Sequence, residues 1–80
     1  MSSVTARNTH TVHADLVAAV MSVEVAVGDR LTPTDPVCIL ESMKMEIPVL
    51  AERAGTVTEV VVRAGDVVHD GDPLVILSLS

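Results

Sequence analysis

Lys44 stands between two methionines in the run Glu41-Ser42-Met43-Lys44-Met45-Glu46, which holds the residues best suited to chemistry. Residues 37–41 and 46–50 read as strands, so the run falls on a turn that exposes one amine, a nucleophile when neutral, and two thioethers. Two-residue turns between strands favour Asn-Gly, Asp-Gly or Gly-Gly because their central residues need positive φ. Met-Lys offers no such relief, which indicates a functional turn.

The composition predicts one small all-β domain. Eighty residues leave room for a single modest core, and the absence of Phe, Tyr and Trp means that aliphatic side chains must build it. Eight short apolar runs separated by Gly, Asp and Pro predict a flattened barrel or sandwich without a helix. We expect residues 1–6 to form a disordered tail and residues 7–80 to form the domain.

The chain also contains an internal repeat. Shifting it so that residue 7 falls on residue 44 aligns residues 7–43 with residues 44–80 without a gap. The coinciding positions include Val20 with Val57, Val23 with Val60, Gly28-Asp29 with Gly65-Asp66, and Asp35-Pro36 with Asp72-Pro73. Eight strands related by a pseudo-two-fold axis would form two four-stranded antiparallel sheets. The seam at Lys44 should then lie at the opposite end of the domain from the chain termini.

Alternating hydrophobicity predicts which side chains of the two longer strands face the core. The expected inward positions are Met21, Val23, Val25 and Val27 in the first half and Thr58, Val60, Val62 and Ala64 in the second. Pro48 lacks an N–H and therefore fits an edge strand.

Charge and hydropathy exclude several classes of partner. The formal net charge is −6, and the five Lys and Arg residues are scattered, whereas phosphate binding needs clustered cations. We therefore expect no nucleic-acid partner, and a basic protein surface fits better. No segment approaches the ~20 apolar residues of a membrane span, and the N-terminus lacks the pattern of a signal peptide. We expect a cytoplasmic protein with no membrane partner.

The other reactive side chains predict neither catalysis nor metal binding. His10, His13 and His69 are dispersed without Cys or carboxylate partners at ligand spacing, so no zinc site is expected. Cys38 lies in an apolar run and should be buried and inert. No nucleophile elbow or glycine-rich phosphate loop is present, so we expect no catalytic residue.

Residues 41–46 and the stretch Ala54-Gly55-Thr56-Val57 together resemble the biotinyl domain family, the biotin carboxyl carrier proteins and carrier segments of biotin-dependent carboxylases. The match covers about residues 11–79. It implies the biotinyl/lipoyl fold, a barrel-sandwich hybrid, with biotin attached to the side-chain amine of Lys44. Ser42 stands where the family most often has alanine, and both are small. Some members carry an inserted thumb, for which the equal spacings 21–28 and 58–65 leave no residues.

The resemblance further implies a non-catalytic carrier whose biotin acts as a swinging arm. A biotin protein ligase would modify Lys44, and Glu41, Ser42, Met43 and Met45 would be recognised by this ligase and by later partners. Those partners would be a biotin carboxylase and a carboxyltransferase, which we expect to belong to an acyl-CoA carboxylase. Two alternatives remain open: a lipoyl carrier of a 2-oxo acid dehydrogenase, and an unmodified β-sandwich adaptor. The methionine flanks favour biotin, because lipoyl domains are expected to carry Asp-Lys-Ala or a similar flank.

Overall fold

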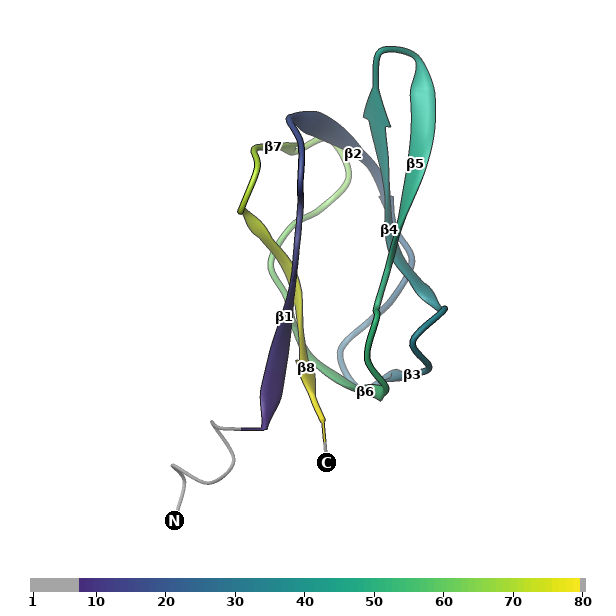
Figure 1. Ribbon diagram of the computed structural model, residues 1–80, viewed down its shortest axis with the longest axis vertical. Coiled ribbons are helices and arrows are strands. Elements are labelled where there is room, and N and C mark those ends of the chain that lie inside the picture. The colour runs from purple at the N-terminus through teal and green to yellow at the C-terminus, as the bar shows by residue number, and fades with distance from the viewer. Residues whose placement is uncertain (1–7, 80) are drawn as a thin grey trace.

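The computed structural model describes residues 8–79 and consists of two antiparallel sheets of four strands each (Figure 1). The strands are β1 (Thr9–His13), β2 (Ala18–Val23), β3 (Arg30–Leu31), β4 (Pro36–Ser42), β5 (Met45–Leu50), β6 (Gly55–Val60), β7 (Val67–Val68) and β8 (Pro73–Ser78). Residues 8–79 contain no helix that could span a membrane. The prediction of an eight-stranded all-β sandwich is confirmed, whereas the expected tail, residues 1–6, lies outside the described residues.

The two halves of the chain build the two sheets in the same way. The strand orders are β1-β8-β6-β3 and β5-β4-β2-β7, and the repeat converts one order into the other. The backbone hydrogen bonds between the halves repeat as well. The N–H of Val20 donates to the carbonyl of Asp66 at 2.8 Å, and the N–H of Val57 donates to the carbonyl of Asp29 at 2.9 Å. The loops after β2 and β6, residues 24–29 and 61–66, are equally long, so neither carries an insertion.

Aspartates close the turns of both halves. Each carboxylate accepts a hydrogen bond from the backbone N–H three residues earlier in the chain, a local bond typical of turns. The four bonds are Ala26 to Asp29 at 2.9 Å, Thr32 to Asp35 at 2.9 Å, Arg63 to Asp66 at 3.0 Å and His69 to Asp72 at 2.8 Å. Gly28 and Gly65 precede two of these aspartates at φ 99° and 98°, a conformation that favours glycine. Much of the acidity of the chain therefore stabilises its turns.

The core between the sheets is aliphatic. Its largest fully buried side chains are Leu40, Leu74, Leu77, Val12, Val37, Val57, Val75 and Cys38. No polar or charged residue in the described part of the chain is buried. Since β4 contributes three of these side chains, the root of the β4–β5 hairpin is fixed by the same core that stabilises the whole domain.

The predicted inward faces of β2 and β6 are correct in part. Val23, Val25, Val60 and Val62 are half-buried and pack against the core. Met21 and Thr58 are instead exposed, because a bulge between Val20 and Ser22 and its counterpart between Val57 and Glu59 insert one residue and turn it outward. Val27 and Ala64 are exposed because each strand ends before them and the chain turns there.

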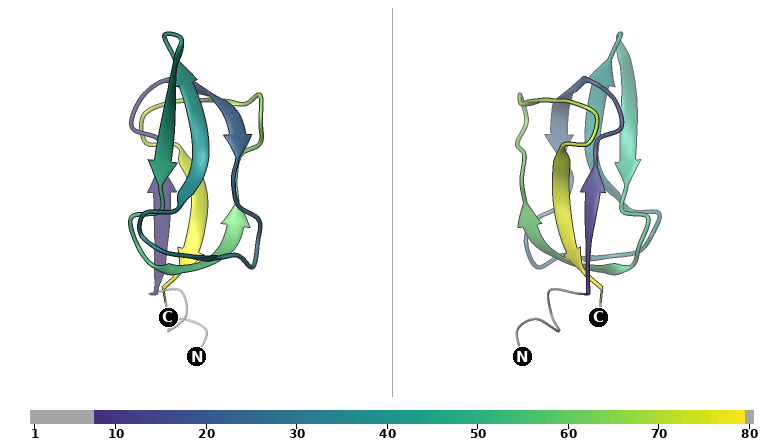
Figure 2. Two further views of the ribbon diagram at one scale, coloured as in Figure 1. Left: turned by 90° about the vertical axis from the view of Figure 1, so that its right-hand side faces the viewer. Right: turned by 60° about the vertical axis from the view of Figure 1, so that its left-hand side comes forward.

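The β4–β5 hairpin and the chain ends lie at opposite ends of the domain. Figures 1 and 2 show the hairpin projecting beyond the body, while β1 begins and β8 ends at the far end. Strand β5 is an edge strand paired only with β4, which confirms the prediction made from Pro48. The hairpin tip is therefore open to solvent on every side except its root.

Substitution of Val60 by Asp tests the register of β6. An unpaired charge placed against the core should lower the free energy of unfolding by about 2 kcal/mol or more. Val61→Asp is the matched control, because Val61 is exposed and a surface charge should change the stability by less than about 0.5 kcal/mol. Thermal unfolding followed by circular dichroism measures both, and equal losses in the two variants would show that the register is wrong by one residue.

Candidate functional site

The turn at the tip of the hairpin consists of Met43 and Lys44. The last strand pair before it joins Ser42 to Met45. Both turn residues are left-handed, with φ of 53° at Met43 and 65° at Lys44. Positive φ at both central positions is typical of the type I′ turn, whose twist matches that of the flanking strands. The expectation that this turn needs positive φ without glycine is confirmed.

The left-handed turn is costly for these residues. An L-residue in this region costs roughly 1–2 kcal/mol, because Cβ crowds the backbone. Two adjacent residues bear that cost here, and the only other non-glycine residue with positive φ within 8–79 is Glu52. The paired strands beneath the turn hold it in place. The backbone therefore presents the Lys44 side chain from a fixed position and in a fixed direction.

The side chains of the turn point into solvent. Met43 is 91% exposed, Met45 is 63% exposed, and Lys44 is exposed between them. Within residues 8–79 no hydrogen bond or ion pair involves the Lys44 amine. Lys44 is also the only lysine in the sequence. Any modification specific to a lysine amine must therefore occur on this turn.

Two carboxylates lie just below the turn. Glu41 and Glu46 are directly opposite each other on β4 and β5, and both are exposed. Like charges directly opposite in an antiparallel pair are destabilising. Glu46 was not among the predicted recognition residues, although the two-residue turn fixes its pairing with Glu41 and so could have identified it. Ser42, in contrast, is half-buried opposite Met45 and has little surface to offer a partner.

The remaining candidate groups form no reactive centre. Cys38 is fully buried, and burial, with a smaller contribution from the nearby Glu24 carboxylate, raises the pKa of its thiol to about 11. This thiol is therefore protonated near neutral pH and shielded from reagents, as predicted. The described part of the chain contains no group of three or more His, Cys, Asp or Glu residues placed to hold a metal ion.

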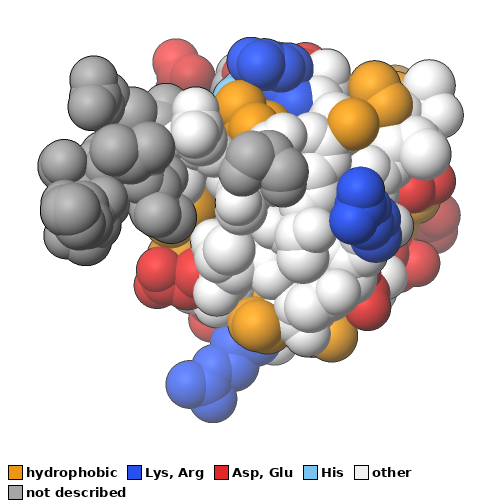
Figure 3. All heavy atoms as spheres, turned by 90° about the horizontal axis from the view of Figure 1, so that it is seen from below, with side chains coloured by type: hydrophobic (Ala, Val, Ile, Leu, Met, Phe, Trp, Pro, Cys, Tyr) orange, Lys and Arg blue, Asp and Glu red, His pale blue; other side chains and the backbone are white. Residues whose placement is uncertain are grey.

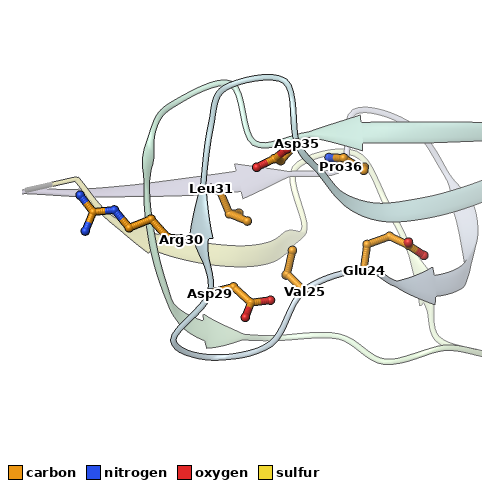
Figure 4. Close-up of a pocket in the computed structure, with 7 residues that line it drawn as sticks. All are labelled: Glu24, Val25, Asp29, Arg30, Leu31, Asp35 and Pro36. Carbon is orange, nitrogen blue, oxygen red and sulfur yellow. The ribbon is translucent and has the colours of Figure 1, made fainter.

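Two hollows in the described surface lie away from the hairpin tip. One, of about 290 Å³, is lined by Glu24, Val25, Asp29, Arg30, Leu31, Asp35 and Pro36 (Figure 4). Two of its carboxylates, Asp29 and Asp35, already accept backbone hydrogen bonds, and Arg30 points away from the others. The second, of about 230 Å³, lies between the edge strands β1 and β5. The candidate site is therefore a projecting amine and not a cavity.

Comparisons with known proteins agree with this geometry. A family model described as "Biotin-requiring enzyme" matches residues 10–77. The chain is 49% identical over 67 residues to a "Biotinylated protein TB7.3 homolog" from Mycobacterium leprae, covering 84% of this chain and 94% of that protein. It is 46% identical over 70 residues to a "Biotin/lipoyl attachment protein" from Bacillus subtilis, covering 88% of this chain and 96% of that protein. Among solved structures, a single-chain, multi-domain long-chain acyl-CoA carboxylase superposes with a TM-score of 0.84 at 29% identity, covering 91% of this chain and 7% of that one.

Glycine substitution tests the cost of the turn. Met43→Gly should raise the free energy of unfolding by about 0.5–1 kcal/mol, because glycine adopts positive φ without crowding. Met45→Gly is the matched control on the adjacent strand, where glycine should lower stability by about 0.5–1 kcal/mol. Chemical denaturation measures both variants, and a loss of stability in Met43→Gly equal to that in Met45→Gly would contradict a strained turn.

Proposed function

This chain belongs to the biotin/lipoyl attachment family of biotin-requiring enzymes, and on that premise we propose that Lys44 carries covalently attached biotin. One observation supports this assignment above all: the only lysine of the sequence lies on a left-handed, solvent-exposed turn at the end of the domain. An enzyme that forms an amide on Lys44 can reach it without unfolding any part of the body.

The hairpin does not activate its own lysine. Amide formation requires the neutral amine, whereas lysine is almost wholly protonated near pH 7. Glu41 and Glu46 on the hairpin strands make no ion pair or hydrogen bond with the Lys44 amine and so are not placed to take up its proton. We infer that a biotin protein ligase presents an activated biotin carboxyl group and accepts the proton that the ammonium group loses. The chain supplies position, and the ligase supplies the base.

The protein is a carrier and not a catalyst, as its membership of an attachment family shows. Attached biotin supplies a ureido nitrogen that can carry a carboxyl group between two separate active sites. The chain contributes the projecting hairpin and the lysine side chain. Because biotin is tethered to them, its local concentration at each site is high, and neither site has to bind free biotin from solution. We propose that these sites are a biotin carboxylase and a carboxyltransferase.

The acceptor is proposed to be an acyl-CoA. The structural likeness to a long-chain acyl-CoA carboxylase supports this assignment. The hairpin tip is an exposed two-residue turn, so we propose that the carboxyltransferase and not the carrier selects the acceptor. We further propose that the protein works in the cytoplasm, where the three partner activities would meet it.

A lipoyl carrier is the second candidate, because the Bacillus subtilis relative is named for both groups. Met43 and Met45 favour biotin, since the resemblance to lipoyl domains would call for a small polar flank such as Asp-Lys-Ala. The double variant Met43→Asp with Met45→Ala therefore separates the two functions. Biotinylation of this double variant should be slower than that of the parent, because we expect the ligase to recognise the two thioethers.

Replacement of Lys44 by Arg tests the attachment site. Lys44→Arg should abolish incorporation of biotin, measured by intact mass and by streptavidin binding after incubation with a biotin protein ligase, biotin and ATP. The free energy of unfolding should stay within about 0.5 kcal/mol of that of the parent, because the Lys44 side chain is exposed and makes no hydrogen bond or ion pair within residues 8–79. Arg53→Lys is the control that restores a lysine on an exposed loop, and it should remain unmodified in the Lys44→Arg background. Biotin on the Lys44→Arg variant would place the modification elsewhere, whereas biotin on the variant that also carries Arg53→Lys would show that the ligase does not require the hairpin position.

A further inference from the structure

The internal repeat allows the two outer sheet faces to be compared position by position. Both faces have the same backbone, the same bulges and the same pairing, so differences between their side chains are not demanded by the fold. One face lies beneath the Lys44 hairpin on the β5-β4-β2-β7 sheet. We call it the hairpin-side face, and the equivalent surface of the β1-β8-β6-β3 sheet the opposite face.

The hairpin-side face is apolar with an acidic edge. Its first row across the sheet runs Val67, Ala19, Glu41, Glu46, as the strand pairing shows. The next row crosses the bulge, where Met21 turns outward without a partner and Ser22 pairs with Ile39, which in turn pairs with Pro48. Val67 is 64% exposed and Met21 is 41% exposed. No Lys or Arg belongs to either row.

The opposite face is more polar at the equivalent positions. Arg30, Thr56, Ser78 and Thr9 form its first row. In its second row Thr58, Glu59 and Thr11 replace Met21, Ser22 and Pro48, while Ile76 matches Ile39. The Thr58 hydroxyl donates to the carbonyl of Ile76 at 3.1 Å, which binds this side chain to its own sheet. Threonine suits a strand as well as valine does. The fold is therefore satisfied by polar residues where the hairpin-side face exposes apolar ones.

The two faces also differ in charge at one pair of equivalent positions. Glu41 and Glu46 give the hairpin-side face two uncompensated negative charges directly opposite each other, an arrangement that opposes folding. Serine and threonine stand at the equivalent pair, Ser78 and Thr9. Figure 3 views the domain from the end opposite the hairpin, where Lys and Arg side chains stand among acidic ones and apolar atoms form only small separate spots. An apolar strip with an acidic edge, next to the reactive amine, is typical of a binding surface.

We propose that the hairpin-side face is the docking surface for the biotin protein ligase, which would cover it with an apolar patch edged by Arg or Lys side chains. This proposal rests on the proposed function of Lys44. The ligase is the partner favoured by geometry, because it acts on the lysine amine itself and must place its active site within one side-chain length of the turn. Later partners meet a longer arm and can stay further from the sheet.

The contacts divide into two roles. Glu41 and Glu46 face the basic edge of the ligase and favour encounter, an effect that salt weakens. Met21, Ile39 and Val67 lie further from the amine, and their burial slows dissociation of the complex. Methionine suits this position because its flexible side chain adapts to the partner surface.

Exchange of equivalent residues between the faces tests the proposal in the full chain. The variant Met21→Thr with Val67→Arg gives the hairpin-side face the side chains of the opposite face. Biotinylation by purified ligase should lose about tenfold in kcat/KM, chiefly through a higher KM, because a docking contact is lost while the amine is unchanged. The matched control is Thr58→Met with Arg30→Val, which makes the converse exchange and should leave kcat/KM unchanged.

A second measurement avoids any folding defect of the variant. Lys44→Arg cannot be modified, so its complex with the ligase can be followed by hydrogen exchange. Protection in residues 18–22 and 37–42 without protection in 56–59 and 74–78 supports the proposal. Protection of the second set alone, equal kcat/KM in both exchange variants, or self-association of the parent through the hairpin-side face would overturn it. Failure of the parent to accept biotin would instead overturn the assignment of Lys44, which keeps the two failures distinct.

Discussion

The left-handed backbone at Met43 and Lys44 is the constraint on which the proposed function depends. Two L-residues hold positive φ only because β4 and β5 close the turn between them and the inner side chains of β4, led by Leu40, are fixed in the core. A longer or glycine-rich turn would relieve the strain, but it would allow more backbone conformations and so hold the Lys44 amine less firmly in one position. The structure thus combines a fixed turn with an exposed Lys44 side chain that makes no hydrogen bond or ion pair within residues 8–79, which suits the proposed carrier function.

Symmetry explains how so small a chain produces this arrangement. The two halves share their bulges, their aspartate-closed turns and their pairing, so one core supports both sheets. The same symmetry separates structural from functional acidity. Asp29, Asp35, Asp66 and Asp72 are used in turns, whereas Glu41 and Glu46 have no equivalent in the other half. The negative charge that we propose for ligase docking is therefore confined to these two carboxylates near Lys44.

The sequence predicts most of the fold because the repeat makes its signals appear twice. Strand number, the edge position of Pro48 and the burial of Cys38 all follow from pattern and turn residues. The outward direction of Met21 and Thr58 does not follow from the sequence pattern. One bulged residue shifts the alternation of inward and outward side chains, and the pattern alone does not show where a bulge occurs. The pairing of Glu46 with Glu41 needed the exact length of the turn. The turn itself was predictable from the strand patterns on either side of it, and the absence of glycine from the turn indicated a function.

Fragmentation mass spectrometry of the native protein, purified from the cells that make it, can show whether Lys44 carries biotin. We expect one biotinyl group per chain, located by the fragments on the peptide that contains Lys44, in at least part of the purified protein. A lipoyl group on that peptide, a biotinyl group on another residue, or an unmodified Lys44 in cells with an active biotin protein ligase would contradict this expectation.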